Sequence, residues 1–255
     1  MRFSFIHGIK RFGAKDKMDD IRINKYMALC GICSRREADE VIEAGRVFIN
    51  GNKAELGSKV SDGDVVLFDG KEIKPESKKV VAFYKPVGVT CTEADVHANI
   101  TLTEVFHYPT RLSYAGRLDE DSEGLLIMTN DGDLIHTMML GSNNHEKEYL
   151  VTVDKHIEPI IYERMERGLY LYDLDVTTKP CKIIPVGDNK FRIILTQGLN
   201  RQIRRMCLEC GLEVLTLKRI RVCNISVEGL KPNEYREIEG EELKELYRMV
   251  FETNE

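Results

Sequence analysis

The densest group of chemically capable side chains lies in a short loop bounded by glycines. Residues 115–130 read AGRLDEDSEGLLIMTN, so that a run of acidic residues precedes an apolar stretch. Four of these residues are carboxylates: Asp119, Glu120, Asp121 and Glu123. Such carboxylates can be solvated, as most charged side chains are, can bind calcium, or can include a catalytic aspartate presented on a loop.

Calcium fits this loop poorly. The first half matches an EF-hand loop, but the twelfth position, which needs a bidentate glutamate, is Asn130. The flanking segments are also not two helices. The sequence therefore argues against calcium and leaves a solvated loop or a catalytic aspartate as the open alternatives.

Cysteine and histidine spacing offers a second possible metal site. Two Cys-x-x-Cys pairs, Cys30 with Cys33 and Cys207 with Cys210, have the spacing of a four-thiolate zinc site. The pairs fall on two different expected domains, and each lies in or beside a helix whose apolar spacing explains it as packing. The six histidines show no ligand spacing. We expect no bound metal.

The composition is that of an ordinary globular protein of 255 residues, with 42% apolar and 31% charged residues. We find no secretory signal and no apolar run near the roughly 18 residues of a membrane span. The seven cysteines are an odd number. We therefore expect a cytoplasmic protein with free thiols.

The net charge of −5 conceals an uneven distribution. Residues 228–255 contain nine acidic and four basic side chains and carry the whole net charge, whereas residues 196–221 contain six Arg or Lys against two Glu. A phosphate responds to the local field rather than to the total charge. The chain is therefore compatible with a nucleic-acid partner.

The elements that must position these residues fall into two predicted domains. After an unassigned basic extension at residues 1–20, residues 21–74 predict two short helices and a small sheet, with a capping box at Ser34 and Glu37. The expected elements are helices at 23–30 and 34–45, strands at 47–49 and 65–68, and an Asn-Gly turn after the first strand.

A polar linker at residues 75–79 leads to a second domain, at residues 80–248, and a tail at 249–255. Helices and strands alternate irregularly in this domain, which indicates an α+β fold. The expected strands are 80–84, 124–129, 149–153 and 191–195, and the expected helices are 133–140 and 201–210.

Two arginines, Arg35 and Arg36, begin the second predicted helix, where the helix dipole disfavours positive charge. Either they are solvated, or they grip a phosphate together with the exposed amides of the first turn. The stretch INKYMALCGICSRREADEVIEAGRVFING resembles the RNA-binding domain of ribosomal protein S4 type. That resemblance favours the phosphate grip.

Four motifs follow in order in the second domain: AGRLDEDSEGLLIMTNDG, HEKEYLVTV, GLNRQIRRMC and LKRIRV. They resemble the pseudouridine synthases, in the branch typified by ribosomal small-subunit pseudouridine synthase A. HEKEYLVTVD and QGLNRQIRRMC point further to the large-subunit subgroup, that of ribosomal large-subunit pseudouridine synthase F. The resemblance places the essential aspartate at Asp119, the active-site tyrosine at Tyr149 and the basic partner of the aspartate at Arg204.

The resemblance implies a fold and a reaction. The fold is α+β, with a small helical RNA-binding domain of ribosomal protein S4 type followed by a pseudouridine synthase domain with a mixed, largely antiparallel sheet. The reaction isomerises uridine to pseudouridine in structured RNA. It needs no cofactor or metal, because it includes neither a redox step nor a net hydrolysis.

The resemblance also assigns roles. Arg204 would keep Asp119 ionised, and Tyr149 would stack on the uracil and help to move the C5 proton. The target base must be flipped out of its stack, and Arg117 would fill the vacated space, unless it forms a salt bridge within the acidic loop. Arg201 and Arg205 would hold phosphates or are solvated.

The expected partner is RNA, most of all large-subunit ribosomal RNA, and the expected oligomeric state is a monomer. Small-subunit ribosomal RNA and tRNA are alternative substrates. A non-catalytic RNA-binding assembly factor is a rival function, but it would fit a chain that lacked Asp119, Tyr149 or Arg204. A metal-dependent nuclease is a second rival, which sensitivity to a chelator would reveal.

Overall fold

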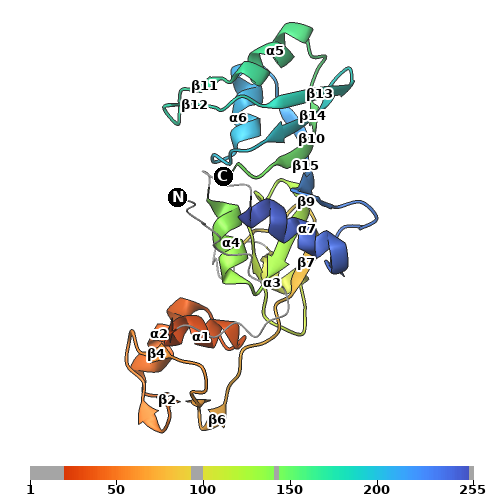
Figure 1. The fold of residues 1–255 in the computed structure, drawn as a ribbon. Helices are drawn as coiled ribbons and strands as arrows, with labels where there is room; N and C mark the ends of the chain where they lie inside the picture. Colours follow the sequence, from red (N-terminus) through yellow and green to blue (C-terminus); the bar gives the residue numbers. More distant parts are fainter. Residues whose placement is uncertain (1–19, 93–99, 141–143, 253–255) are drawn as a thin grey trace, which may run out of the picture. The chain divides into compact units, whose positions relative to one another are not determined.

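The structure is a computed structural model of the chain, and it describes residues 20–92, 100–140 and 144–252 (Figure 1). The chain divides into two compact units, Met1–Glu76 and Ser77–Glu255. The division lies inside the expected linker, whereas the expected N-terminal extension lies, apart from Asp20, outside the described residues. No helix within the described ranges combines the length and the apolar character that crossing a membrane requires.

The N-terminal unit combines two helices with short strands around its own apolar core. Its elements are β1 (Ile21–Arg22), α1 (Ile23–Leu29), α2 (Arg35–Glu43), β2 (Val47–Ile49), β3 (Asn52–Lys53), β4 (Lys59–Val60), β5 (Val66–Phe68) and β6 (Lys71–Glu72). The predicted capping box is confirmed, because the Ser34 amide donates to Glu37 Oε2 at 2.6 Å and the Glu37 amide donates to Ser34 Oγ at 3.3 Å. Asn50 and Gly51 turn the chain between β2 and β3 with φ of 49° and 81°, as a tight hairpin requires.

The C-terminal unit is built on a nine-stranded sheet. The nine strands of this sheet are β7 (Val80–Lys85), β8 (Ser113–Tyr114), β9 (Glu123–Thr129), β10 (Lys147–Val153), β13 (Lys182–Gly187), β14 (Lys190–Leu195), β15 (Val214–Val222), β16 (Ile225–Ser226) and β17 (Tyr235–Glu237), and the unit also contains β11 (Tyr170–Leu171) and β12 (Val176–Thr177). Its helices are α3 (Leu102–Val105), α4 (Gly132–Met139), α5 (Pro159–Arg167), α6 (Gln202–Glu209) and α7 (Gly240–Phe251).

The sheet runs in the order β13-β14-β10-β15-β9-β7-β17, with β16 beside β15 and β8 beside β9. Among its described strands, every neighbouring pair is antiparallel except β15 with β9. The predicted α+β fold with a mixed, largely antiparallel sheet is therefore confirmed. β11 and β12 form a separate hairpin.

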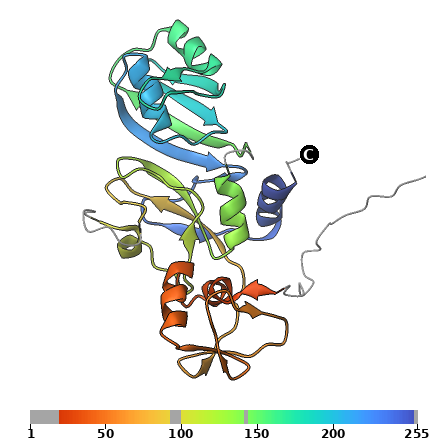
Figure 2. The ribbon, with the colours of Figure 1, turned by 90° about the vertical axis from the view of Figure 1, so that its left-hand side faces the viewer.

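Helices bury the two halves of the sheet in separate cores. α4 and α7 lie side by side against the β7–β9 half (Figures 1 and 2), and α5 and α6 pack their buried Met165, Ile203 and Met206 with β10 and β14. The tail expected from residue 249 is wrong, because α7 continues to Phe251 and Val250 is fully buried. The apolar spacing of α7 continues past residue 248, where the resemblance to the family ended.

Candidate active site

Pairing across four neighbouring strands brings four residues into one row. Lys85, the last residue of β7, lies opposite Gly124 of β9; Gly124 lies opposite Arg219 of β15; and Arg219 lies opposite Tyr149 of β10. Adjacent strands are about 4.8 Å apart, so the row is roughly 15 Å long. The acidic loop ends at the middle of this row, where β9 begins.

Gly124 allows β9 to start beside β15. Its φ is 108°, and a Cβ at this position would lie 2.3 Å from the Arg219 carbonyl oxygen. No side chain fits that distance or favours that backbone conformation. The glycine that bounds the acidic loop is therefore required by the parallel pairing of β9 with β15, and this pairing fixes where the loop ends.

Two buried cations hold the backbone on either side of Asp119. Arg219, with 2% of its surface exposed, donates from Nε to the Leu125 carbonyl at 2.7 Å and from Nη1 to the Arg117 carbonyl at 3.2 Å. Lys85 is fully buried and donates to the Ser122 carbonyl at 2.7 Å and to the Pro86 carbonyl at 2.9 Å.

Burial lowers the pKa of the Lys85 amine, yet its two carbonyl acceptors suit an ammonium donor. Sequence reasoning missed both Lys85 and Arg219 as site residues. For Lys85 the available signal was a basic residue at the end of an otherwise apolar strand, since such a residue is seldom buried without a specific partner. Arg219 carried no such signal, because Lys218 and Arg221 lie in the same strand.

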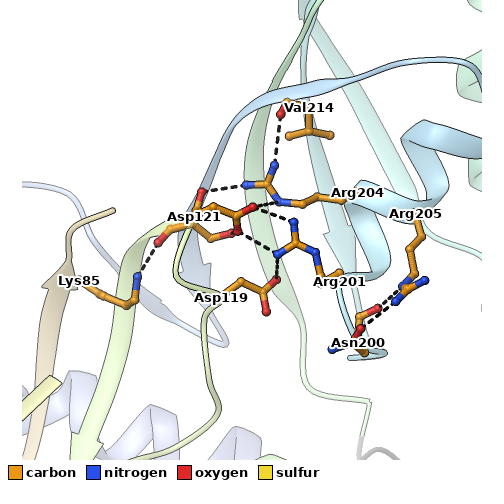
Figure 3. A network of polar contacts seen from close by, with 9 residues as sticks. Lys85, Asp119, Asp121, Asn200, Arg201, Arg204, Arg205 and Val214 are labelled. Carbon is orange, nitrogen blue, oxygen red and sulfur yellow. Dashed lines mark hydrogen bonds and ion pairs between the residues drawn. The ribbon is translucent and has the colours of Figure 1, made fainter. Parts of the chain in front are cut away.

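Asp119 and Asp121 face the first turn of α6, where two arginines meet them (Figure 3). Arg201 donates from Nη1 and Nη2 to the two carboxylate oxygens of Asp121, at 3.1 and 2.7 Å, and its Nη1 lies 3.8 Å from Asp119 Oδ2. Partial burial opposes ionisation of Asp121, but the hydrogen bond from Arg201 and the charges of both arginines hold the pKa of this carboxyl below its usual value.

The ion pair expected between Arg204 and Asp119 is absent from the described contacts, and Arg204 pairs with Asp121 instead. Its Nη1 donates to the Val214 carbonyl at 3.1 Å and its Nη2 to the Asp121 carbonyl at 2.8 Å. With both amino groups fixed, the remaining Nε faces Asp121 Oδ2 at 3.3 Å. The cation beside Asp119 is Arg201, which occupies the N-cap position of α6, with its backbone in the left-handed region at φ 48°.

The structure also places three further residues that the sequence predicts for the site, namely Tyr149, Arg117 and Arg205. Tyr149 is half-buried and packs between two core clusters, one on the α5–α6 side and one that includes Leu118. Arg117 is exposed, and within the described part of the chain its guanidinium makes no ion pair, so the salt bridge considered for the acidic loop is not formed. Arg205 is directed to Asn200 and to Asp173 rather than to Asp119 or Asp121.

Arg35 and Arg36 lie in the N-terminal unit, at the first two positions of α2. Both are exposed, and neither forms an ion pair with another described residue. In the C-terminal unit, Arg201, Arg204 and Asp121 also line a cavity of about 890 Å³, together with apolar residues that include Val87, Leu208 and Leu212.

No group of three or more His, Cys, Asp or Glu side chains within the described ranges is arranged to hold a metal ion. The two Cys-x-x-Cys pairs belong to different units, and all seven cysteines are free thiols. Burial raises the pKa of Cys30 and of Cys207 to about 12, which suits thiols that serve as core residues.

Comparison with known proteins shows which family the chain belongs to. Residues 79–209 match the family described as RNA pseudouridylate synthase, and residues 21–66 match the S4 domain. A solved structure described as a pseudouridylate synthase superposes with a TM-score of 0.65 at 28% identity, covering 89% of this chain and 99% of its own. The chain belongs to the RNA pseudouridylate synthase family and carries an N-terminal S4 domain.

Two relatives with known names are similar to this chain over most of its length. The chain is 43% identical over 233 residues to the dual-specificity RNA pseudouridine synthase RluF of Escherichia coli, covering 90% of this chain and 79% of the relative. It is 33% identical over 232 residues to the ribosomal large subunit pseudouridine synthase B of Bacillus subtilis, covering 88% and 95%. The protein is therefore an isomerase that converts uridine to pseudouridine in RNA, and the rival function of a non-catalytic RNA-binding protein is excluded.

Proposed function

We propose that the enzyme modifies uridine in structured RNA of the large ribosomal subunit, with Asp119 as the catalytic carboxylate. One observation carries the assignment of Asp119. Its side chain is 36% exposed, lies 3.8 Å from a guanidinium, and belongs to a loop whose backbone is fixed on both sides by buried cations. A carboxylate held in this way is preorganised, remains accessible to a substrate and has a cation at hand.

The reaction breaks the bond between N1 of uracil and C1′ of the sugar, turns the base, and forms a bond from C5 to C1′; C5 loses its proton and N1 gains one. Asp119 acts as the nucleophile, or as the base and ion-pair stabiliser. Tyr149 stacks on the uracil, and its phenol helps to transfer the C5 proton. Arg204, by binding Asp121 and the Val214 carbonyl, keeps the cationic side of the site in place.

RNA is held by cations outside the reacting centre. The target base must leave its stack, and Arg117, which is exposed and unpaired among the described residues, fills the vacated space. Arg35 and Arg36 hold backbone phosphates through the S4 domain, and Arg201 and Arg205 hold phosphates beside the target. The name of the Bacillus subtilis relative favours the large subunit as the source of the RNA.

The test is tritium release from C5-tritiated large-subunit RNA by the wild type and by Asp119→Asn. Isomerisation leaves the mass of the RNA unchanged, so loss of the C5 hydrogen reports the reaction directly. We expect release by the wild type alone. Release by both proteins would overturn the role of Asp119, and release by neither would overturn the choice of large-subunit RNA.

A second RNA substrate is a specific alternative, because the Escherichia coli relative is described as dual-specific. Shape and flanking contacts, which motifs do not encode, determine such a choice. The same assay on small-subunit RNA and on bulk tRNA, each tritiated at C5, distinguishes the candidates. Release confined to tRNA would replace the proposed substrate, and release from tRNA and large-subunit RNA would extend it.

A further inference from the structure

Two guanidiniums converge on one carboxylate at the edge of the site. Arg201 donates hydrogen bonds to both oxygens of Asp121, and Nε of Arg204 lies 3.3 Å from one of them as an ion pair (Figure 3). This planar two-oxygen contact is the geometry in which arginine also binds a phosphate. Asp121 therefore occupies a position with the shape and charge of an oxyanion site.

The ion pair between Arg201 and Asp121 is weak, so another anion can replace Asp121 on Arg201. The side chains of Arg201 and Asp121 are 40% and 45% exposed, and ion pairs this exposed contribute little to stability. Arg204 is only 15% exposed and has two backbone carbonyl acceptors, so it stays in place when Asp121 moves. Arg204 is thus fixed, and Arg201 is available to bind another anion.

The backbone of Arg201 supports a role beyond packing. It is a non-glycine residue at φ 48°, a conformation that carries a free-energy cost and gathers at functional sites. The conformation turns its side chain toward Asp119 and Asp121, whereas Arg205, four residues along the same helix, is directed to Asn200 and Asp173. Arg201 is therefore the exposed cation that faces the proposed reacting centre.

We propose that Asp121 is the stand-in for an RNA phosphate, and that the phosphate next to the target uridine displaces it from Arg201 when RNA binds. The inference rests on the proposed function, since it takes Asp119 as the centre at which the target nucleotide arrives. Asp121 thereby lowers the affinity for RNA that presents no phosphate at this point, and it keeps Arg201 oriented until the substrate arrives.

The test compares the RNA affinity of two variants of the full chain. Asp121→Asn removes one negative charge and releases a guanidinium. Glu245→Gln is the matched control, because Glu245 holds Arg248 through both carboxylate oxygens at 2.6 and 2.7 Å, with side chains 42% and 59% exposed, on α7. The probe is unmodified, in-vitro-transcribed large-subunit RNA, with Kd measured by filter binding over a range of KCl concentrations.

We expect Asp121→Asn to lower Kd by roughly two- to fivefold, the range that corresponds to an exposed ion pair that no longer has to be broken. Glu245→Gln should leave Kd within about 1.5-fold of the wild type. In an Arg201→Asn background, in which asparagine tolerates the left-handed backbone, Asp121→Asn should give no gain. Arg201→Asn alone should reduce the slope of log Kd against log salt by about 0.7 to 0.9.

Three results would overturn the inference: no gain from Asp121→Asn, an equal gain from Glu245→Gln, or a gain that survives in the Arg201→Asn background. Thermal melting of each variant shows whether it is folded, and Asp121→Ser repeats the test should the asparagine keep the contact. Binding requires no turnover, so failure of the proposed function, seen as tritium release by Asp119→Asn, is distinguishable from failure of this inference.

Discussion

Replacing Arg219 by methionine should separate catalysis from stability. Arg219 is buried and joins β15 to the backbone on both sides of Asp119, through the carbonyls of Arg117 and Leu125. Methionine is shorter than arginine, has a similar side-chain volume and has no hydrogen-bond donor. The substitution therefore removes the restraint on the loop while leaving most of the packed volume filled.

The loss of stability should be small because two terms oppose each other. Two hydrogen bonds from a charged donor contribute about 1.5 to 3 kcal/mol each. Against this, burying a cation costs several kcal/mol, and Nη2 of Arg219 is buried with no partner among the described residues. We expect a net destabilisation of no more than about 3 kcal/mol, which lowers Tm by about 2 to 4 °C per kcal/mol in a unit of this size.

The loss of rate should be large, because a displacement of about 1 Å at a reacting group can cost about 100-fold. We expect single-turnover tritium release to slow by about that factor or more, with Kd for RNA within threefold of the wild type. Arg221→Met, two residues along β15, is the control, because Arg221 contacts Glu146 and Glu148 rather than the loop. A folded Arg219→Met enzyme within threefold of the wild-type rate, or an equal loss in Arg221→Met, would refute the reasoning.

Three further results follow from the same structure. Gly124→Ala should destabilise the protein by more than about 2 kcal/mol, because its Cβ would meet the Arg219 carbonyl at 2.3 Å; an unchanged Tm would contradict this. Burial opposes ionisation of Asp131, but hydrogen bonds from Lys78 and Tyr247 hold its pKa below the usual value. Its contribution to stability is therefore present above about pH 4 and is lost as the pH falls through its lowered pKa, so urea unfolding between pH 5 and about pH 2 should show a flatter acid limb for Asp131→Asn. Turnover should be unaffected by EDTA, and inhibition that added metal reverses would revive a metal-dependent mechanism.

Local patterns predicted the elements well because the interactions that start and end them are local. The capping box of Ser34 and Glu37 and the Asn50-Gly51 turn are contacts within four residues, and both are present. The ends of the predicted helices and strands lie within two residues of those in the structure. Apolar spacing likewise places Ile23, Met27 and Ile42 in a core.

Strand partners could not be read in this way. β15 pairs with β9 in parallel and with β10 in antiparallel fashion, and nothing within nine residues of strand sequence specifies either neighbour. Lys85 acquires its role through the pairing of β7 with β9, and Arg219 through the pairing of β15 with β9, so neither role can be read from the neighbouring sequence. Their acceptors lie as many as 37 and 102 residues away along the chain.

The choice between Asp119 and Asp121 shows the same limit at the scale of the site. The sequence does not show which of two carboxylates separated by one residue pairs with a given arginine. The backbone conformation around Asp119 and Asp121 determines which of them does. The Asp121 and Val214 carbonyls fix Arg204 so that its Nε meets Asp121. A carboxylate bound through both oxygens is a poor nucleophile, since its lone pairs are already engaged by donors. By taking the tight contacts, Asp121 leaves the proposed catalytic Asp119 with one guanidinium at 3.8 Å, a distance beyond a hydrogen bond that leaves the Asp119 oxygens open to the substrate.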